Sequence, residues 1–270
     1  DMPVHPELLD WLAAEFIDSG WDVKHMLRLM LHSRAYQQVA TVTAKLQERD
    51  PDNRWLARGP RFRPSGELLR DQALAVSGLL SPKMFGPPVR PVRPNLGLGV
   101  AFGGKGGKDW EASSGEDRYR RSVYTEVRRN SPYPSFTTFD APNREVCTIR
   151  RGRSNTPLQA FVTLNDPVFI ECHQALARRM VAVGGDDREA ALRFAYQVCL
   201  GREPSMADLK TLLQVYEESS RHYAAHPDLA LKMATEPLGP LADDSQLATL
   251  AAWTNVAGVL MNLDEFLMRP

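Results

Sequence analysis

The chain has 270 residues, of which 43% are hydrophobic and 24% are charged, as in an ordinary globular protein with ample core. Basic and acidic side chains balance at 33 each, but residues 117–170 carry nine basic and five acidic ones, whereas residues 171–270 carry nine and fourteen. A chain with zero net charge and an acidic C-terminal part is not predicted to bind nucleic acid. No apolar run reaches the ~20 residues of a membrane helix, so no membrane span is predicted.

The first 80 residues are predicted to form helices. Pro6 and Glu7 suit a first helical turn, and the apolar residues that follow keep helical spacing until Gly20. Asp22 is suited to cap a second helix with an apolar face, so a helical hairpin is expected. A third helix is predicted over about residues 66–78.

An irregular segment is predicted over residues 81–155. Residues 81–116 contain five prolines and eight glycines, a composition typical of a long loop. The run from Gly99 to Gly106 nearly matches a phosphate-binding P-loop, but Gly106 stands where that loop needs serine or threonine, so a plain loop is favoured. Alternating β-branched residues from Ser122 to Val127 predict at most a short strand.

Helices are predicted again after Asn155. Thr156-Pro157 and Asp166-Pro167 each place a capping residue before a proline, and Asp187 and Ser205 begin two further helices. A last helix is expected over about residues 246–266. The predicted fold is mainly α and forms a single domain over residues 1–270, with N-terminal helices in 5–80, an irregular arginine-rich insert in 81–155 and C-terminal helices in 156–270. The opening DMPVHPELLDWL lies at a helix start, which suggests a piece of a longer protein.

No metal centre is predicted from the histidines and cysteines. Cys147, Cys172 and Cys199 are far apart, without zinc spacing or a CxxCH haem attachment site. His222 and His226 are four residues apart, but the glutamate of HExxH is absent, so favourable interaction with a helix C-terminus is the simpler reading. No catalytic constellation can be assembled from spacing, and no reaction is predicted.

The candidate binding site is the arginine-rich segment. Nine arginines and no lysine lie between Arg118 and Arg153. Arginine pairs with carboxylate, phosphate or sulfate through a planar fork, so the segment either binds an anion or joins the fold through ion pairs. Because a helix is predicted to begin at Pro157, the stretch just before it is the place where an anion site is expected. The candidate ligand-binding residues are Asp140, Arg144, Arg150, Arg151, Arg153 and Asn155, whereas Arg118 to Arg129 are expected to be structural.

Several motifs together carry a family resemblance over nearly the whole chain, from His5 to Leu267. They read HPELLDWLAAEFIDSGWDVKHMLRLMLHSRAYQQ, GEDRYRRSVYT and FDAPNREVCTIRRGRSNTPLQAFVTLNDPVF. This pattern resembles the planctomycete-specific C-terminal domain of unknown function, family 1553, of PSD1-type proteins. The chain departs from it at Ser65-Gly66, where a more helix-favouring pair is expected, and at Arg63, where leucine is common. We expect those departures to affect helix packing and not the candidate site.

The resemblance implies a context and no catalytic residues. Members look like C-terminal parts of large exported proteins, so it implies localisation in the periplasm or cell envelope and upstream domains of the same polypeptide as partners. A c-type haem is implied for an absent N-terminal domain, and no cofactor is expected here. The leading hypothesis is a non-catalytic or accessory domain that docks onto an upstream domain. The alternative is a domain that binds or processes an anionic or sulfated polysaccharide at the arginine-lined site, and a third is a redox partner for a haem domain.

Overall fold

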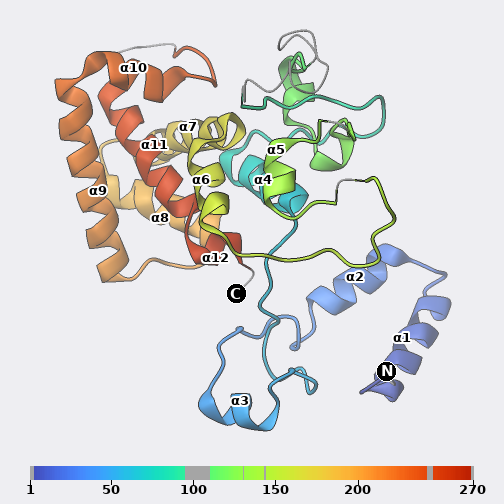
Figure 1. The fold of residues 1–270 in the computed structure, drawn as a ribbon. Helices are drawn as coiled ribbons and strands as arrows, with labels where there is room; N and C mark the ends of the chain where they lie inside the picture. The colour runs from blue at the N-terminus through green and yellow to red at the C-terminus, as the bar shows by residue number, and fades with distance from the viewer. Residues whose placement is uncertain (1–2, 95–109, 130, 143, 242–245, 269–270) are drawn as a thin grey trace. The chain divides into compact units, whose positions relative to one another are not determined.

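The computed structural model describes residues 3–94, 110–129, 131–142, 144–241 and 246–268, and these residues are mainly helical (Figure 1). The glycine-rich run from Gly99 to Gly106 lies outside the described residues. The chain forms two compact units, one of residues 1–62 with 268–270 and one of residues 63–267. Helix α4 (Gly66–Ser77) therefore belongs to the second unit and not with the helices before residue 63. That both units fold as one domain stays a prediction.

The first unit contains the predicted helical hairpin. Helices α1 (Pro6–Asp18) and α2 (Val23–Leu31) flank Gly20, whose φ is +71°. The Asp22 carboxylate caps α2, because it accepts hydrogen bonds from the backbone N–H groups of Lys24 and His25 at 2.8 and 3.0 Å. His25 also contacts Glu15 of α1 at 2.6 Å. Sequence reasoning missed the short helix α3 (Ala44–Arg49), which the Thr43 hydroxyl caps.

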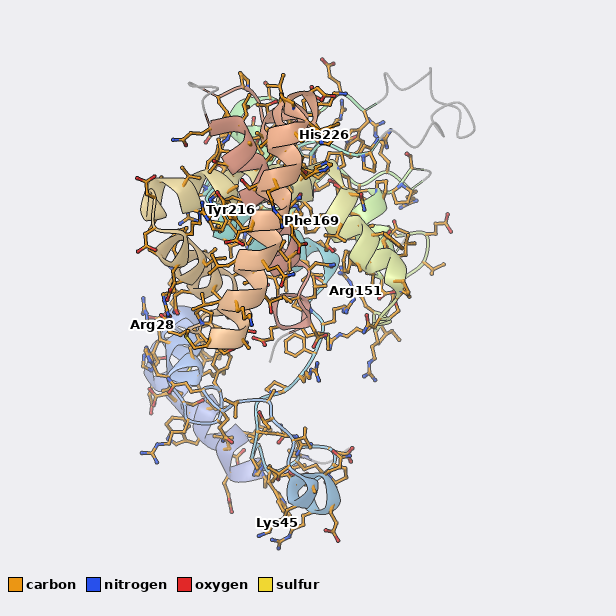
Figure 2. The ribbon with its side chains drawn as sticks, turned by 90° about the vertical axis from the view of Figure 1, so that its left-hand side faces the viewer. Arg28, Lys45, Arg151, Phe169, Tyr216 and His226 are labelled. Carbon is orange, nitrogen blue, oxygen red and sulfur yellow. The ribbon has the colours of Figure 1, made fainter. Side chains whose placement is uncertain are left out.

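The second unit is built around two long helices, α7 (Pro167–Gly184) and α11 (Leu247–Met261). Figure 1 shows α11 between α7 and α9 (Met206–Ala225), and its buried residues occupy every side of the helix, as expected for a central element. The rings of Tyr216 and Trp253 lie 4.1 Å apart at the contact between α9 and α11. Figure 2 labels Phe169 and Tyr216 within this group of helices. The remaining helices are α4 (Gly66–Ser77), α5 (Pro134–Thr138), α6 (Pro157–Asn165), α8 (Arg188–Leu200), α10 (Pro227–Thr235) and α12 (Asp264–Leu267).

The predicted helix starts in this unit are confirmed. Asp166 and Asp187 accept hydrogen bonds at the first turns of α7 and α8, and Ser205 forms a reciprocal capping box with Asp208 at α9. Helix α10 was missed, although His226-Pro227-Asp228 repeats the pattern of His5-Pro6-Glu7 that predicted α1. The predicted last helix instead ends at Met261 and restarts at Asp264.

The short strand that the sequence allowed over residues 122–127 is not formed, in keeping with a mainly helical fold. Residues Ser122–Tyr124 form a 3-10 helix (η2), which follows another (η1, Gly115–Tyr119). The β-pairing of this part of the second unit includes two isolated parallel bridges, Ser81 with Arg120 and Val89 with Thr125. Prolines at 87, 88 and 91 flank Val89 and have no N–H to donate, so the pairing cannot extend into a ladder.

Candidate functional site

Most arginines in the first half of the arginine-rich segment have partners inside the fold. Arg118 pairs with Glu171 of α7, which is 1% exposed. Arg120 is also 1% exposed; it donates to the carbonyls of Phe85 and Pro87, and its guanidinium lies 3.9 Å from the centre of the Tyr124 ring. The hydrogen bonds to Phe85 and Pro87 tie the segment to the loop before it. These arginines join parts of the fold, as expected for a structural role.

A polar network attaches the same segment to α4. The buried side chain of Arg70 donates to the carbonyls of Arg118 and Arg120 at 3.0 and 2.9 Å and to the Ser122 hydroxyl at 3.2 Å. The Asp71 carboxylate accepts a hydrogen bond of 2.7 Å from the Ser122 N–H. Residues 118–122 are therefore held by side chains of a helix some fifty positions earlier in the chain.

The second half of the segment lines a cavity of about 770 Å³. Its lining comes from three stretches of the second unit, residues 63–65 before α4, Phe139 and Asp140 after α5, and residues 149–153 before α6. Four of the lining residues are arginines: Arg63, Arg150, Arg151 and Arg153. A volume of this size lies within the range of small-molecule binding sites, and the concentration of guanidinium groups favours an anion.

The arginines of this cavity, here called the arginine pocket, differ in what they already contact. Arg151, which Figure 2 labels, forms an ion pair with Glu67 of α4 through contacts of 2.8 and 3.0 Å. Arg63 is only 8% exposed, and donates to Asn155 at 2.8 Å and to Gln159 of α6. Arg150 is exposed, and over the ranges that the structure describes its side chain has no hydrogen bond or ion pair. Arg150 is thus the guanidinium most available to a ligand.

Asp140 and Ser154 shape the pocket. Asp140 has a positive φ of 61°, and its two carboxylate oxygens accept hydrogen bonds of 2.7 to 2.9 Å from the N–H and hydroxyl of Ser154. Gln159 of α6 donates to the same hydroxyl at 3.1 Å and completes a capping box with Thr156. These contacts fix the end of the segment where residues 149–153 line the pocket. Since the carboxylate of Asp140 is already engaged, the geometry supports a positioning role for it.

The candidate residues predicted from sequence are only partly brought together. Asp140, Arg150, Arg151 and Arg153 line the arginine pocket, while Asn155 touches it indirectly as the acceptor for Arg63. Arg144 lines a different, smaller cavity of about 50 Å³ that also includes Glu67. The expectation that Arg63 and Ser65 concern only helix packing is wrong, because both line the arginine pocket. The sequence feature that pointed to Arg63 is its charge at a position where the resemblance predicts leucine.

Gly66 allows α4 and α5 to approach each other closely beside the arginine pocket. A Cβ atom at Gly66 would lie 2.9 Å from the Cβ of Phe139 and 3.3 Å from the Cα of Phe136. Such contacts are too short for any larger residue without a shift of α5 or α4. The unusual Ser65-Gly66 pair therefore allows α5 to pack on the first turn of α4, where the Ser65 hydroxyl also caps the helix.

Two acidic groups whose pKa is raised by burial lie in the core and do not line the pocket. Burial raises the pKa of Glu171, although Arg118 acts in the opposite direction. Burial likewise raises the pKa of Asp166, whose carboxylate accepts from Ser135. Neither residue lines the arginine pocket. Perturbed carboxyl groups are also common in structural networks, and here Glu171 forms an ion pair with Arg118 while Asp166 caps α7.

Histidines and cysteines form no metal centre in the described part of the chain. The rings of His222 and His226 stack with centres 4.5 Å apart, and His226 Nδ1 is hydrogen-bonded to the carbonyl of His222 at 2.8 Å, near the end of α9. Cys172 and Cys199 are buried, and Cys147 is exposed as a free thiol. None of the helices described is both long and apolar enough to cross a membrane.

Comparison with known proteins identifies the family but no close relative. Searches of curated proteins and of solved structures find no match. A family model described as PSD1, protein of unknown function (DUF1553), matches residues 1–216, which include α1 to α8, the arginine pocket and most of α9. This match confirms the family resemblance over residues 1–216; its extension to Leu267 stays a prediction. The chain therefore belongs to the PSD1 family of proteins of unknown function, DUF1553.

Proposed function

We propose that the second unit is a non-catalytic module that binds an anionic ligand in the arginine pocket, with a sulfated polysaccharide as the ligand class. The observation that carries the proposal is Arg150, an exposed guanidinium without a partner among the described residues, in a cavity with three further arginines. Sulfate and carboxylate groups accept two hydrogen bonds from one guanidinium, and charge-assisted contacts of this kind are stronger than neutral ones.

Binding is favoured over processing by the state of the acid in the pocket. Cleavage of a glycoside commonly requires two carboxyl groups, one to donate and one to accept a proton or attack the sugar. Asp140 is the acidic residue among those that line the pocket, and Ser154 already occupies both of its oxygens. The pocket thus offers positive charge and positioned donors, which suits recognition.

The proposal is tested by isothermal titration calorimetry with a heparin tetrasaccharide at low salt, and with a neutral dextran oligomer as the ligand control. Arg150→Gln should weaken binding about tenfold, which corresponds to the ~1.4 kcal/mol expected when one charge-assisted hydrogen bond is removed. Arg221→Gln is the matched control, because Arg221 is an exposed arginine of α9 that does not line the pocket. Affinity should also fall as salt is added. Equal binding by Arg150→Gln and wild type, or no binding to any anionic glycan at low salt, contradicts the proposal.

A second function is favoured by the apolar surface of the first unit. No residue of α1 is buried, although the helix carries Leu8, Leu9, Trp11 and Ile17, each at least 43% exposed. In α2, Val23, Leu27, Met30 and Leu31 are similarly exposed. Apolar surface of this extent is typical of an interaction site, so docking onto another domain of the same polypeptide is the second candidate. Lengthening the chain upstream should then protect Trp11 and Trp21 from quenching by acrylamide; unchanged quenching counts against docking.

The exported, envelope location remains a proposal based on the resemblance alone. Fractionation of cells that express the full-length protein tests it directly. Recovery in the cytoplasmic fraction would also weaken the case for a polysaccharide ligand.

A further inference from the structure

Glu67 contacts an arginine of the pocket, Arg151, through both of its carboxylate oxygens. It lies in the first turn of α4, and Arg151 Nη1 approaches its Oε1 and Oε2 at 3.0 and 2.8 Å. The Glu67 side chain is 22% exposed and that of Arg151 is 38% exposed, so the pair is partly shielded from water. A carboxylate of the protein thus uses donors of Arg151 that an anion in the arginine pocket would otherwise accept from.

The pairing leaves Arg151 only partly used. Both contacts come from Nη1, whereas a guanidinium has five N–H donors spread over three nitrogen atoms. A sulfate or carboxylate that binds in the usual two-point manner needs two of these donors side by side. A ligand anion that takes the end-on pair of donors, one from Nη1 and one from Nη2, must therefore compete with Glu67 for Nη1.

We infer that Glu67 is an internal competitor that holds Arg151 while the arginine pocket is empty and releases it when a ligand anion binds. The inference rests on the proposed function and adds to it a residue that sets the affinity. Like charges at short distance repel, so an ionised Glu67 weakens anion binding even before displacement is considered. Its removal should make Arg151 fully available to the ligand.

The released carboxylate has another place to interact. Glu67 also lines the small cavity of about 50 Å³ that contains Arg144, an exposed arginine held at a positive φ of 65°. A rotation of the Glu67 side chain toward this cavity replaces one arginine neighbour with another. Glu67 is ionised at neutral pH in the paired state: burial acts to raise its pKa, but hydrogen bonds, with that from Arg151 first, outweigh burial and lower it.

The first test needs no ligand. Phenylglyoxal modifies accessible guanidinium groups, and peptide mass spectrometry gives the rate at each arginine. Glu67→Gln should raise the modification rate of Arg151 and leave that of Arg150 unchanged. Glu126→Gln is the matched control, because Glu126 lines the same small cavity but pairs with Arg90 and Arg128. An Arg151 rate that is the same in wild type and Glu67→Gln overturns the inference.

The second test measures binding of the heparin tetrasaccharide by calorimetry, after thermal unfolding has shown that each variant folds. Glu67→Gln should bind about fivefold more tightly than wild type, as expected for loss of one partly exposed competing charge, and Glu126→Gln should bind with little change. In an Arg151→Gln background the gain from Glu67→Gln should disappear, because the competition acts through Arg151. A gain that survives in this background, or no gain in wild type, overturns the inference.

The two proposals fail in distinguishable ways. If Arg150→Gln weakens binding but Glu67→Gln has no effect, the pocket is an anion site and Glu67 is not its competitor. If no variant binds the tetrasaccharide, the proposed function is wrong and the release of Glu67 by a ligand falls with it.

Discussion

Replacing Arg70 by methionine is expected to destabilise the second unit severely. Arg70 is 2% exposed, and its two terminal nitrogens donate to three acceptors, the carbonyls of Arg118 and Arg120 and the hydroxyl of Ser122. Methionine fills a similar space but donates nothing, so all three acceptors lose a partner. The same change at the exposed Arg150 removes an equal charge and breaks no hydrogen bond of the described fold, which makes it the matched control.

The magnitude follows from the number of acceptors and their burial. An unsatisfied buried acceptor costs about 1–3 kcal/mol, so three acceptors set an upper range of about 3–9 kcal/mol. Two effects reduce this: each carbonyl keeps a second lone pair, and methionine removes the desolvation cost of a buried guanidinium. We therefore expect Arg70→Met to lower the free energy of unfolding by about 3 kcal/mol, whereas Arg150→Met should stay within about 0.5 kcal/mol of wild type.

Urea unfolding followed by circular dichroism measures both variants. In a chain of this size a loss of 3 kcal/mol corresponds to a fall in Tm of roughly 6–12 °C. If Arg70→Met costs less than about 1 kcal/mol, the contacts between α4 and residues 118–122 do not stabilise the fold, and the structural reading of the buried arginines is refuted. A loss in Arg150→Met as large as that in Arg70→Met would refute it equally, because charge alone would then explain the effect.

Two further predictions concern the core and the division of the chain. His173 is buried and its Nε2 has no hydrogen-bond partner among the described residues, and burial lowers its pKa from 6.5 to about 4. Between these pH values the imidazole of His173 binds a proton in the unfolded chain but not in the folded one. The free energy of unfolding should therefore fall by up to about 3 kcal/mol as the pH falls from about 6.5 to about 4. His173→Leu should flatten this part of the profile of Tm against pH, and an identical slope in both proteins contradicts the assignment. A fragment of residues 63–270 should unfold cooperatively, because the largest core cluster runs from Leu69 to Leu267; binding of a hydrophobic dye and a lost near-ultraviolet signal would show that it needs the first unit.

The helix starts were predictable because their signals are local. A capping side chain accepts hydrogen bonds from N–H groups two or three residues ahead, as Asp22, Asp166 and Ser205 do. Proline at the first helical position acts over an equally short range. Helix α10, which was not predicted, carries the same proline signal at Pro227.

Whether residues 122–127 form a strand could not be predicted from their own sequence. Its β-branched residues fit a strand, but a strand exists only if a neighbour supplies a continuous row of donors and acceptors. The neighbour here is the stretch around Val89, whose prolines limit pairing to one bridge. The partner lies more than thirty positions away, and nothing near residue 122 reveals it.

The sequence by itself determined the family and the mainly helical fold, since motifs and caps are local properties. An anion site in the stretch before Pro157 stays a prediction. Only the tertiary structure decided which arginines are used up inside the fold and which line the arginine pocket. Arg118 pairs with Glu171, which is 53 residues away in the sequence, and Arg151 pairs with Glu67, which is 84 residues away. Ion pairing depends on distance in space and on burial, and neither quantity can be obtained from the order of residues along the chain.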